Sequence, residues 1–218
     1  MEKASRRLYG WLAFFALFGL TLSLFLTAFN IDPVAMADQT LFHQNTAPIR
    51  IVGFFSYFTI WSNLLVVYIG YAVAANKSSS KYFGTLFATA LIMITITGLV
   101  YNTLLLPVYP PKGWYWLTSS LMHLVVPVMY NYLWIKKGPR GNIASQRTLQ
   151  ILAIPIIYLI YTIVHGLAIQ QWPYKFIDLT SEGFLMWTSG VLIIFGFGVL
   201  LIYIFAIVDQ KPLKSNLK

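Results

Sequence analysis

The chain has 218 residues, of which 58% are hydrophobic and 10% charged, and its mean hydropathy is +0.70. Soluble domains usually carry about 25% charged residues, so this composition excludes a soluble globular protein and predicts an integral membrane protein. The net charge of +9 is a poor indication of nucleic-acid binding, because the basic residues are dispersed over short segments between apolar runs. Membrane lipids, including anionic headgroups, are the expected partners, and the sequence identifies no protein partner.

Apolar runs of roughly 20 residues, long enough to cross a bilayer as helices, occur six times along the chain. They cover about residues 8–29, 51–75, 82–106, 114–135, 149–169 and 184–208. The short connections leave no room for a separate soluble domain, and helices satisfy their own backbone polar groups inside a membrane. The sequence therefore predicts one all-α domain over residues 1–218, a bundle of six transmembrane helices in a multi-pass protein of the cell membrane.

The distribution of basic residues predicts the orientation of this bundle. If the N-terminus is cytoplasmic, twelve of the fifteen Lys and Arg residues fall on the inner side, and only Arg50, Lys112 and Lys175 fall outside. Cytoplasmic segments of membrane proteins normally carry such an excess. We therefore expect both termini in the cytoplasm.

The predicted second helix, residues 51–75, carries Ser56, Thr59 and Asn63 at steps of three and four, which places them on one face. Thr59 lies nine residues in from Arg50, roughly 13 Å below the outer boundary at about 1.5 Å per residue. Such side chains often do no more than hydrogen-bond between membrane helices. That structural role remains an alternative to a chemical one.

The predicted fourth helix, residues 114–135, holds one imidazole, His123, in an otherwise apolar run. An ionisable side chain at bilayer depth is costly and indicates a functional site or a polar contact inside the bundle. Pro127, four residues further on, removes the N–H that the His123 carbonyl would accept, which predicts a kink beside the histidine. Ser119, Ser120 and Asn131 share its broad helical face.

Thr59 and His123 are predicted to meet, because His123 also lies nine residues in from the outer end of its helix, at Trp114. A hydroxyl nucleophile activated by histidine needs only these two side chains in contact, with the imidazole as base and then as acid. Burial favours the neutral imidazole, which can take a proton. An acyl-transfer site also needs donors for an oxyanion, and the candidates are Asn63, Asn131, Ser62, Trp61 and Trp116.

Two other classes of function receive less support. All six acidic residues fall outside the cores of the spans, whereas proton-coupled pumps and transporters commonly use intramembrane carboxylates. A metal site could combine His123 with other residues near the outer side, namely His43, His165, Asp178 and Glu182, but no paired His-x-x-x-His spacing occurs. We therefore predict neither a metal nor a cofactor. A non-catalytic lipid-binding or transport bundle remains the competing hypothesis.

Three stretches carry a family resemblance: YFTIWSN at Tyr57–Asn63, MHLVVP at Met122–Pro127 and WPYKFID at Trp172–Asp178. They resemble the androgen-induced gene family of six-span membrane proteins and its bacterial relatives. Animal members of that family are threonine hydrolases that cleave fatty acid esters of hydroxy fatty acids. The resemblance implies a threonine hydrolase of lipid esters with Thr59 as nucleophile and His123 as base.

Overall fold

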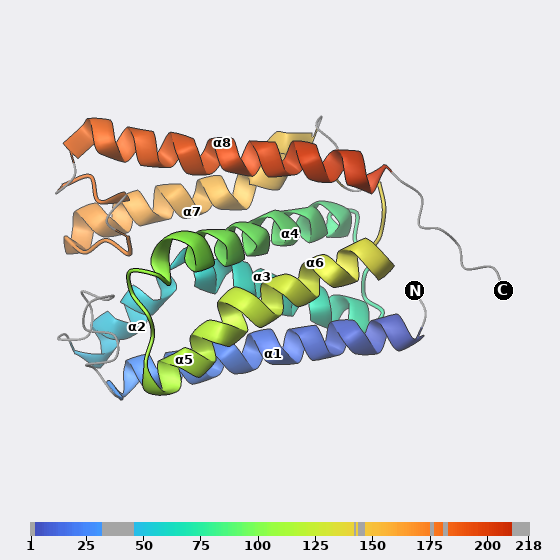
Figure 1. The fold of residues 1–218 in the computed structure, drawn as a ribbon, viewed down its shortest axis with the longest axis horizontal. Helices are drawn as coiled ribbons and strands as arrows, with labels where there is room; N and C mark the ends of the chain where they lie inside the picture. Colours follow the sequence, from blue (N-terminus) through green and yellow to red (C-terminus); the bar gives the residue numbers. More distant parts are fainter. Residues whose placement is uncertain are drawn as a thin grey trace.

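The computed structural model describes residues 3–31, 46–141, 143, 147–174, 177–180 and 183–210. Every regular element in this part of the chain is a helix (Figure 1). In chain order these are α1 (Lys3–Ala28), α2 (Ala47–Phe55), α3 (Phe58–Ala74), α4 (Phe83–Val100), the π-helical turn η2 (Tyr101–Leu105), α5 (Gly113–Ser120), the π-helical turn η3 (Leu121–Val125), α6 (Val126–Lys137), α7 (Thr148–Ile169) and α8 (Gly183–Asp209). The predicted all-α fold class is confirmed for these residues.

Four helices are long and apolar enough to cross a membrane: α1, α4 continued by η2, α7 and α8. Counting α2 and α3 as one bent span makes five. The helix that continues from α5 through η3 to α6 covers Gly113–Lys137, close to the predicted span 114–135, but is not among these candidates. Its histidine, proline, asparagine and aromatic residues lower its hydropathy. The chain is thus a membrane protein by the length and apolarity of its helices.

The second predicted span is wrong in one respect, because residues 51–75 do not form one straight helix. The chain breaks at Ser56 and Tyr57, and α2 and α3 meet there at an angle of 69°. Side chains from elsewhere satisfy the backbone groups that the break leaves open: Trp61 Nε1–H donates to the Phe55 carbonyl (2.9 Å), and the Tyr158 hydroxyl donates to the Ser56 carbonyl (2.9 Å). A break inside a membrane bundle is stable only when its polar backbone is paired in this way.

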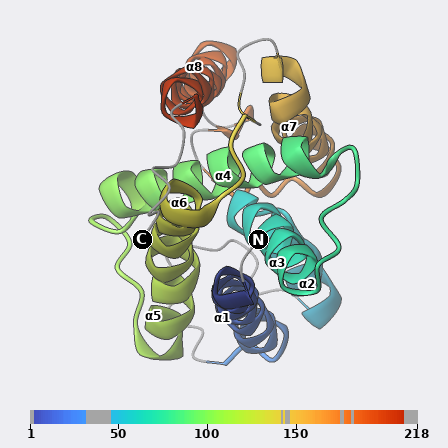
Figure 2. The same ribbon diagram turned by 90° about the vertical axis from the view of Figure 1, so that its right-hand side faces the viewer.

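The most buried of these helices, α4, runs through the middle of the bundle. In both views α7 and α8 lie on one side of it, and α1, α3 and α6 lie on the other (Figures 1 and 2). Tyr9, Val66, Phe87 and Tyr130 belong to the large apolar core, which also includes Leu152 of α7 and Leu201 of α8. The outer face of α8, by contrast, exposes side chains such as Leu185 (82%) and Ile193 (71%). A face this apolar suits contact with lipid.

Close approach of α1 and α3 depends on Gly70. A Cβ at this position would lie 2.7 Å from the Tyr9 carbonyl oxygen and 2.8 Å from the Ala13 Cβ. Small residues at such crossings let membrane helices approach backbone to backbone. The crossing holds α3, and with it Thr59, in a fixed position against α1.

Hydroxyls on α4 link it to three neighbouring helices. Thr97 Oγ1 lies 2.8 Å from Ser62 Oγ on α3, and Thr89 Oγ1 donates to the Ile151 carbonyl on α7 (3.0 Å). Asn131 Nδ2 on α6 donates to Thr95 Oγ1 (2.9 Å). Polar groups in apolar surroundings thus find partners on other helices. Ser62 and Asn131, which the sequence suggested as oxyanion donors, therefore have the structural role of joining helices.

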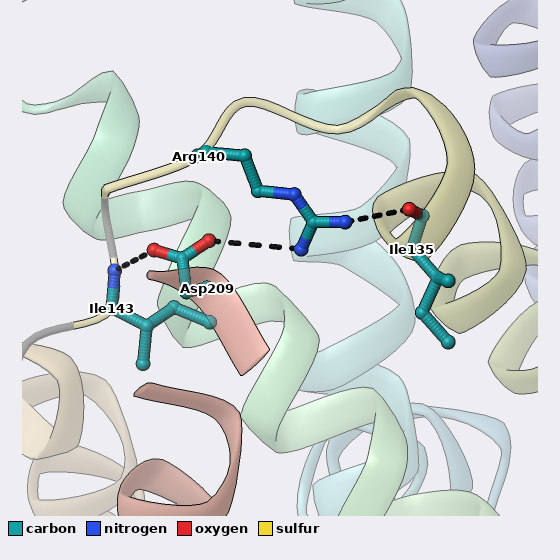
Figure 3. Close-up of polar contacts among 4 residues, drawn as sticks. All are labelled: Ile135, Arg140, Ile143 and Asp209. Atoms are coloured by element: carbon teal, nitrogen blue, oxygen red, sulfur yellow. Dashed lines mark hydrogen bonds and ion pairs between the residues drawn. The ribbon is translucent and has the colours of Figure 1, made fainter. Parts of the chain in front are cut away.

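The first residues of α1 and the last residues of α8 lie at the same end of the bundle (Figure 1). At this end the Arg6 guanidinium donates to the Ala74 carbonyl at the C-terminus of α3 (2.9 Å). Asp209, the last residue of α8, accepts the Ile143 N–H (2.8 Å) and lies 4.0 Å from Arg140 (Figure 3). The connection between α6 and α7 is therefore anchored to the end of α8.

Candidate active site

Thr59 and His123, the two residues predicted to meet, are in contact. Thr59 Oγ1 lies 3.1 Å from His123 Nε2, although the residues are 64 positions apart. Thr59 lies in the first turn of α3, directly after the break, and His123 lies at the centre of the π-helical turn η3. The contact therefore joins the N-terminus of α3 to the π-helical turn η3. Both side chains are half-buried.

The hydrogen-bond partners of His123 Nδ1 indicate which tautomer of the imidazole faces Thr59. Nδ1 lies 3.0 Å from the Ser119 carbonyl oxygen and 3.2 Å from Ser119 Oγ. A carbonyl can only accept, so Nδ1 carries the proton and Nε2 presents its lone pair to the Thr59 hydroxyl. This tautomer is the one that can take the hydroxyl proton.

Neighbouring side chains hold the imidazole ring in this orientation. The Tyr101 ring stacks on it with 3.7 Å between the ring centroids and 17° between the planes. The Tyr101 hydroxyl lies 2.5 Å from Ser119 Oγ, which also contacts the imidazole. Two π-helical turns therefore face each other, with Tyr101 at the start of η2 and His123 within η3. Such turns frequently occur at functional sites.

The carbonyl of His123 loses its helical N–H partner because Pro127 has none. A side chain of η2, which continues α4, supplies a hydrogen bond instead. Asn102 Nδ2 donates to this carbonyl at 2.8 Å and to the Gly98 carbonyl at 2.7 Å. The Pro127 ring packs against Gly98, where a Cβ would lie only 2.8 Å from the Pro127 Cβ. Proline, glycine and asparagine together fix the irregular turn that carries the imidazole.

A largely apolar cavity opens beside Thr59 and His123, here called the dyad, between the start of α3, η3 and the helices α4, α7 and α8. No charged side chain lines it, and its polar lining comes from Thr59, Thr97, Tyr101, His123, Tyr158 and Tyr174. The rest is aliphatic or aromatic, including Ile96, Leu152, Leu159, Ile194 and Phe195. Pockets that combine an apolar lining with a few convergent polar groups are typical ligand sites.

None of the five oxyanion-donor candidates lines this cavity. Asn63 Nδ2 donates to the carbonyls of Thr59 (2.9 Å) and Met122 (3.4 Å). Ser62 and Asn131 link α4 to its neighbours, and the Trp61 indole N–H pairs with the helix break. Trp116 is 61% exposed on the outside of the bundle. The hydrogen-bond donors of these five side chains therefore point to backbone carbonyls, to other side chains or to the outside of the bundle, and not into the cavity.

Tyr174 is a site residue that the sequence reasoning missed. Its hydroxyl accepts the Phe58 N–H (3.2 Å) and also hydrogen-bonds with the Thr59 side chain. Its ring lies edge-on to Tyr57, with 5.7 Å between centroids. The signal was the WPYKFID stretch, which contains Tyr174, but aromatic residues in an external loop resemble an interfacial belt. Only the fold directs this one inward.

The described residues do not support the metal site that the sequence raised as an alternative. Among the described residues no three His, Asp or Glu side chains gather as metal ligands would. His165 is buried against Tyr161 on α7 and does not line the cavity. His43 and Glu182 lie outside the described residues.

Comparisons with known proteins give the chain no relative: no family model, no curated protein and no solved structure matches it.

Proposed function

We propose that this protein is an intramembrane hydrolase of lipid esters, with Thr59 as nucleophile and His123 as general base. The observation that carries the proposal is the 3.1 Å contact between Thr59 Oγ1 and His123 Nε2, at the wall of an apolar cavity. A nucleophile, a base and a group that orients the base form the common pattern of covalent hydrolases. Here the Ser119 carbonyl is the orienting group.

The reaction would proceed in two acyl-transfer steps. His123 Nε2 takes the Thr59 proton as Oγ1 attacks the ester carbonyl, and the imidazolium then returns this proton to the departing alkoxide. A water molecule next gives a proton to Nε2 and its oxygen to the acyl carbon. Collapse of this intermediate releases the fatty acid and returns the proton to Thr59 Oγ1.

The cavity lining supports a lipid as the substrate. An acyl chain buries apolar surface against Ile96, Leu152 and Phe195 at about 25 cal/mol per Å², and no charged side chain opposes it. The resemblance to the androgen-induced gene family adds fatty acid esters of hydroxy fatty acids as the specific substrate class. Family membership and this substrate are parts of the same proposal.

We further propose six spans in the cell membrane, with Gly113–Lys137 as the fourth and both termini in the cytoplasm. The chain has no native cysteine, so single cysteines test this orientation cleanly. Cysteine at exposed Ser79 should resist an impermeant thiol reagent in intact cells, and cysteine at exposed Lys112 should react. Reaction at Ser79 without permeabilisation would contradict the orientation.

Active-site labelling separates hydrolysis from mere lipid binding. A fluorophosphonate probe should label the purified protein, and peptide mapping should find the adduct on Thr59, because a packing hydroxyl is not activated. The His123→Ala variant should lose labelling. An adduct on Ser62, Ser119 or Ser120 would move the nucleophile, and absence of any adduct together with lipid binding would favour the non-catalytic bundle.

A further inference from the structure

We propose that Tyr174 is a third catalytic residue, whose hydroxyl donates a hydrogen bond to the oxyanion that forms when Thr59 attacks an ester. This inference rests on the proposed hydrolase function and assigns the oxyanion donor within the same site. It replaces the five side chains that the sequence suggested for this role.

The position of the Tyr174 hydroxyl carries the proposal. It contacts the Thr59 side chain and the Phe58 N–H at the same time, and both Thr59 and Tyr174 line the cavity. In a tetrahedral intermediate the oxyanion is bonded to the same carbon as Thr59 Oγ1. A donor in contact with Oγ1 in the free protein is therefore within reach of that oxyanion.

The start of α3 strengthens Tyr174 as a donor. The Phe58 N–H and the Thr59 N–H, both in the first turn of α3, are directed at the phenol oxygen. N–H groups there carry the positive end of the helix dipole. A hydroxyl that accepts such bonds becomes a better donor, since hydrogen bonds in a chain polarise one another.

The hydroxyl also keeps its proton under working conditions. Burial raises the pKa of Tyr174 to about 12, against the ordinary value of 10.0, and the hydrogen bonds that its hydroxyl makes with Thr59 and Phe58 oppose part of this rise. The phenol is therefore neutral up to well above pH 9. A pH increase to 9 should leave its donor role intact.

The proposed step moves one hydrogen bond and breaks no bond of Tyr174. As Thr59 Oγ1 bonds to the carbonyl carbon and its proton passes to His123 Nε2, Oγ1 becomes an uncharged alkoxy oxygen of the tetrahedral intermediate. The carbonyl oxygen gains the negative charge, and the Tyr174 hydroxyl turns its hydrogen toward it. The bond thus strengthens in the transition state, which is the condition for raising kcat.

The test is Tyr174→Phe in the full-length protein in detergent micelles, with 4-nitrophenyl octanoate as substrate. Phenylalanine keeps the ring and its contact with Tyr57. We expect kcat to fall about 10²- to 10³-fold, the usual cost of one oxyanion donor, with KM changed by less than about threefold. The matched control is Tyr161→Phe, which removes a hydroxyl outside the cavity and should leave kcat unchanged.

A thionoester of the same acyl chain distinguishes donation to the oxyanion from a structural role. Sulfur accepts hydrogen bonds poorly, so the loss caused by Tyr174→Phe should shrink to less than about tenfold on this substrate. If Tyr174→Phe lowers kcat equally on both substrates, the oxyanion role is wrong. It is also wrong if Tyr174→Phe leaves kcat unchanged while hydrolysis still depends on Thr59. Either result leaves the proposed hydrolase function standing. Absence of any Thr59-dependent hydrolysis would overturn the proposed function as well.

Discussion

Alanine at Thr59 or at His123 should each reduce ester hydrolysis by at least about 10³-fold, and the double variant should be scarcely slower than either single variant. A general base contributes about 10²- to 10⁴-fold, and the base has no function once its nucleophile is removed. Members of one catalytic unit are therefore strongly non-additive. Steady-state rates of the two single variants and the double variant measure this directly.

Two further variants make the dyad test specific. Thr59→Ser keeps the hydroxyl and should retain part of the activity. His165→Ala removes a buried histidine that lies outside the cavity, so its effect should be much milder. Additive losses in the double variant would show that Thr59 and His123 act separately, and hydrolysis that survives Thr59→Ala but stops with a chelator would favour a metal-dependent reaction.

The second large effect is expected at Gly98, which touches neither substrate nor nucleophile. Gly98→Ala would place a Cβ 2.8 Å from the Pro127 Cβ and 3.3 Å from the His123 carbonyl oxygen. Backbone and a rigid proline ring cannot yield without moving η3. Since a displacement near 1 Å can cost about 100-fold in rate, we expect kcat to fall by about that factor.

The control for this substitution is Gly196→Ala on α8, where a Cβ meets no atom within 4 Å. Both changes raise helix propensity by up to about 1 kcal/mol, so propensity alone predicts two stabilised, active proteins. Measuring the thermal unfolding temperature of each variant in detergent, together with its hydrolysis rate, separates a loss of activity from a loss of stability. Full activity in Gly98→Ala would show that the contact with Pro127 does not position the imidazole.

Much of the helical architecture follows from local properties of the sequence. The predicted bounds 8–29, 82–106, 149–169 and 184–208 differ from the observed helices by five residues at most when η2 is counted with α4. Apolar length alone determines such elements, because a helix in lipid must satisfy its own backbone. The contact between Thr59 and His123 was also predicted from equal residue counts in two spans, although the count for Thr59 assumed a straight helix where the chain in fact breaks.

What the sequence could not determine depends on partners that are distant along the chain. The break at Ser56 and Tyr57 is stable because Tyr158 and Tyr174 supply hydrogen bonds from more than 100 residues away. A local pattern contains no trace of such partners, and the apolar run across the break is long enough for one straight helix. The same holds for the oxyanion donor: Asn63 and Trp61 have the right chemistry, but carbonyls of the fold bind their N–H groups.

The sequence by itself determined an all-helical membrane protein and predicted that Thr59 and His123 can meet, because bilayer thickness relates residue number to depth. Only the tertiary structure decided which nitrogen of His123 faces Thr59, where the cavity opens and that Tyr174 reaches the Thr59 side chain. These features depend on the directions of side chains across helix contacts. Packing of the whole bundle sets those directions, and no single segment encodes them.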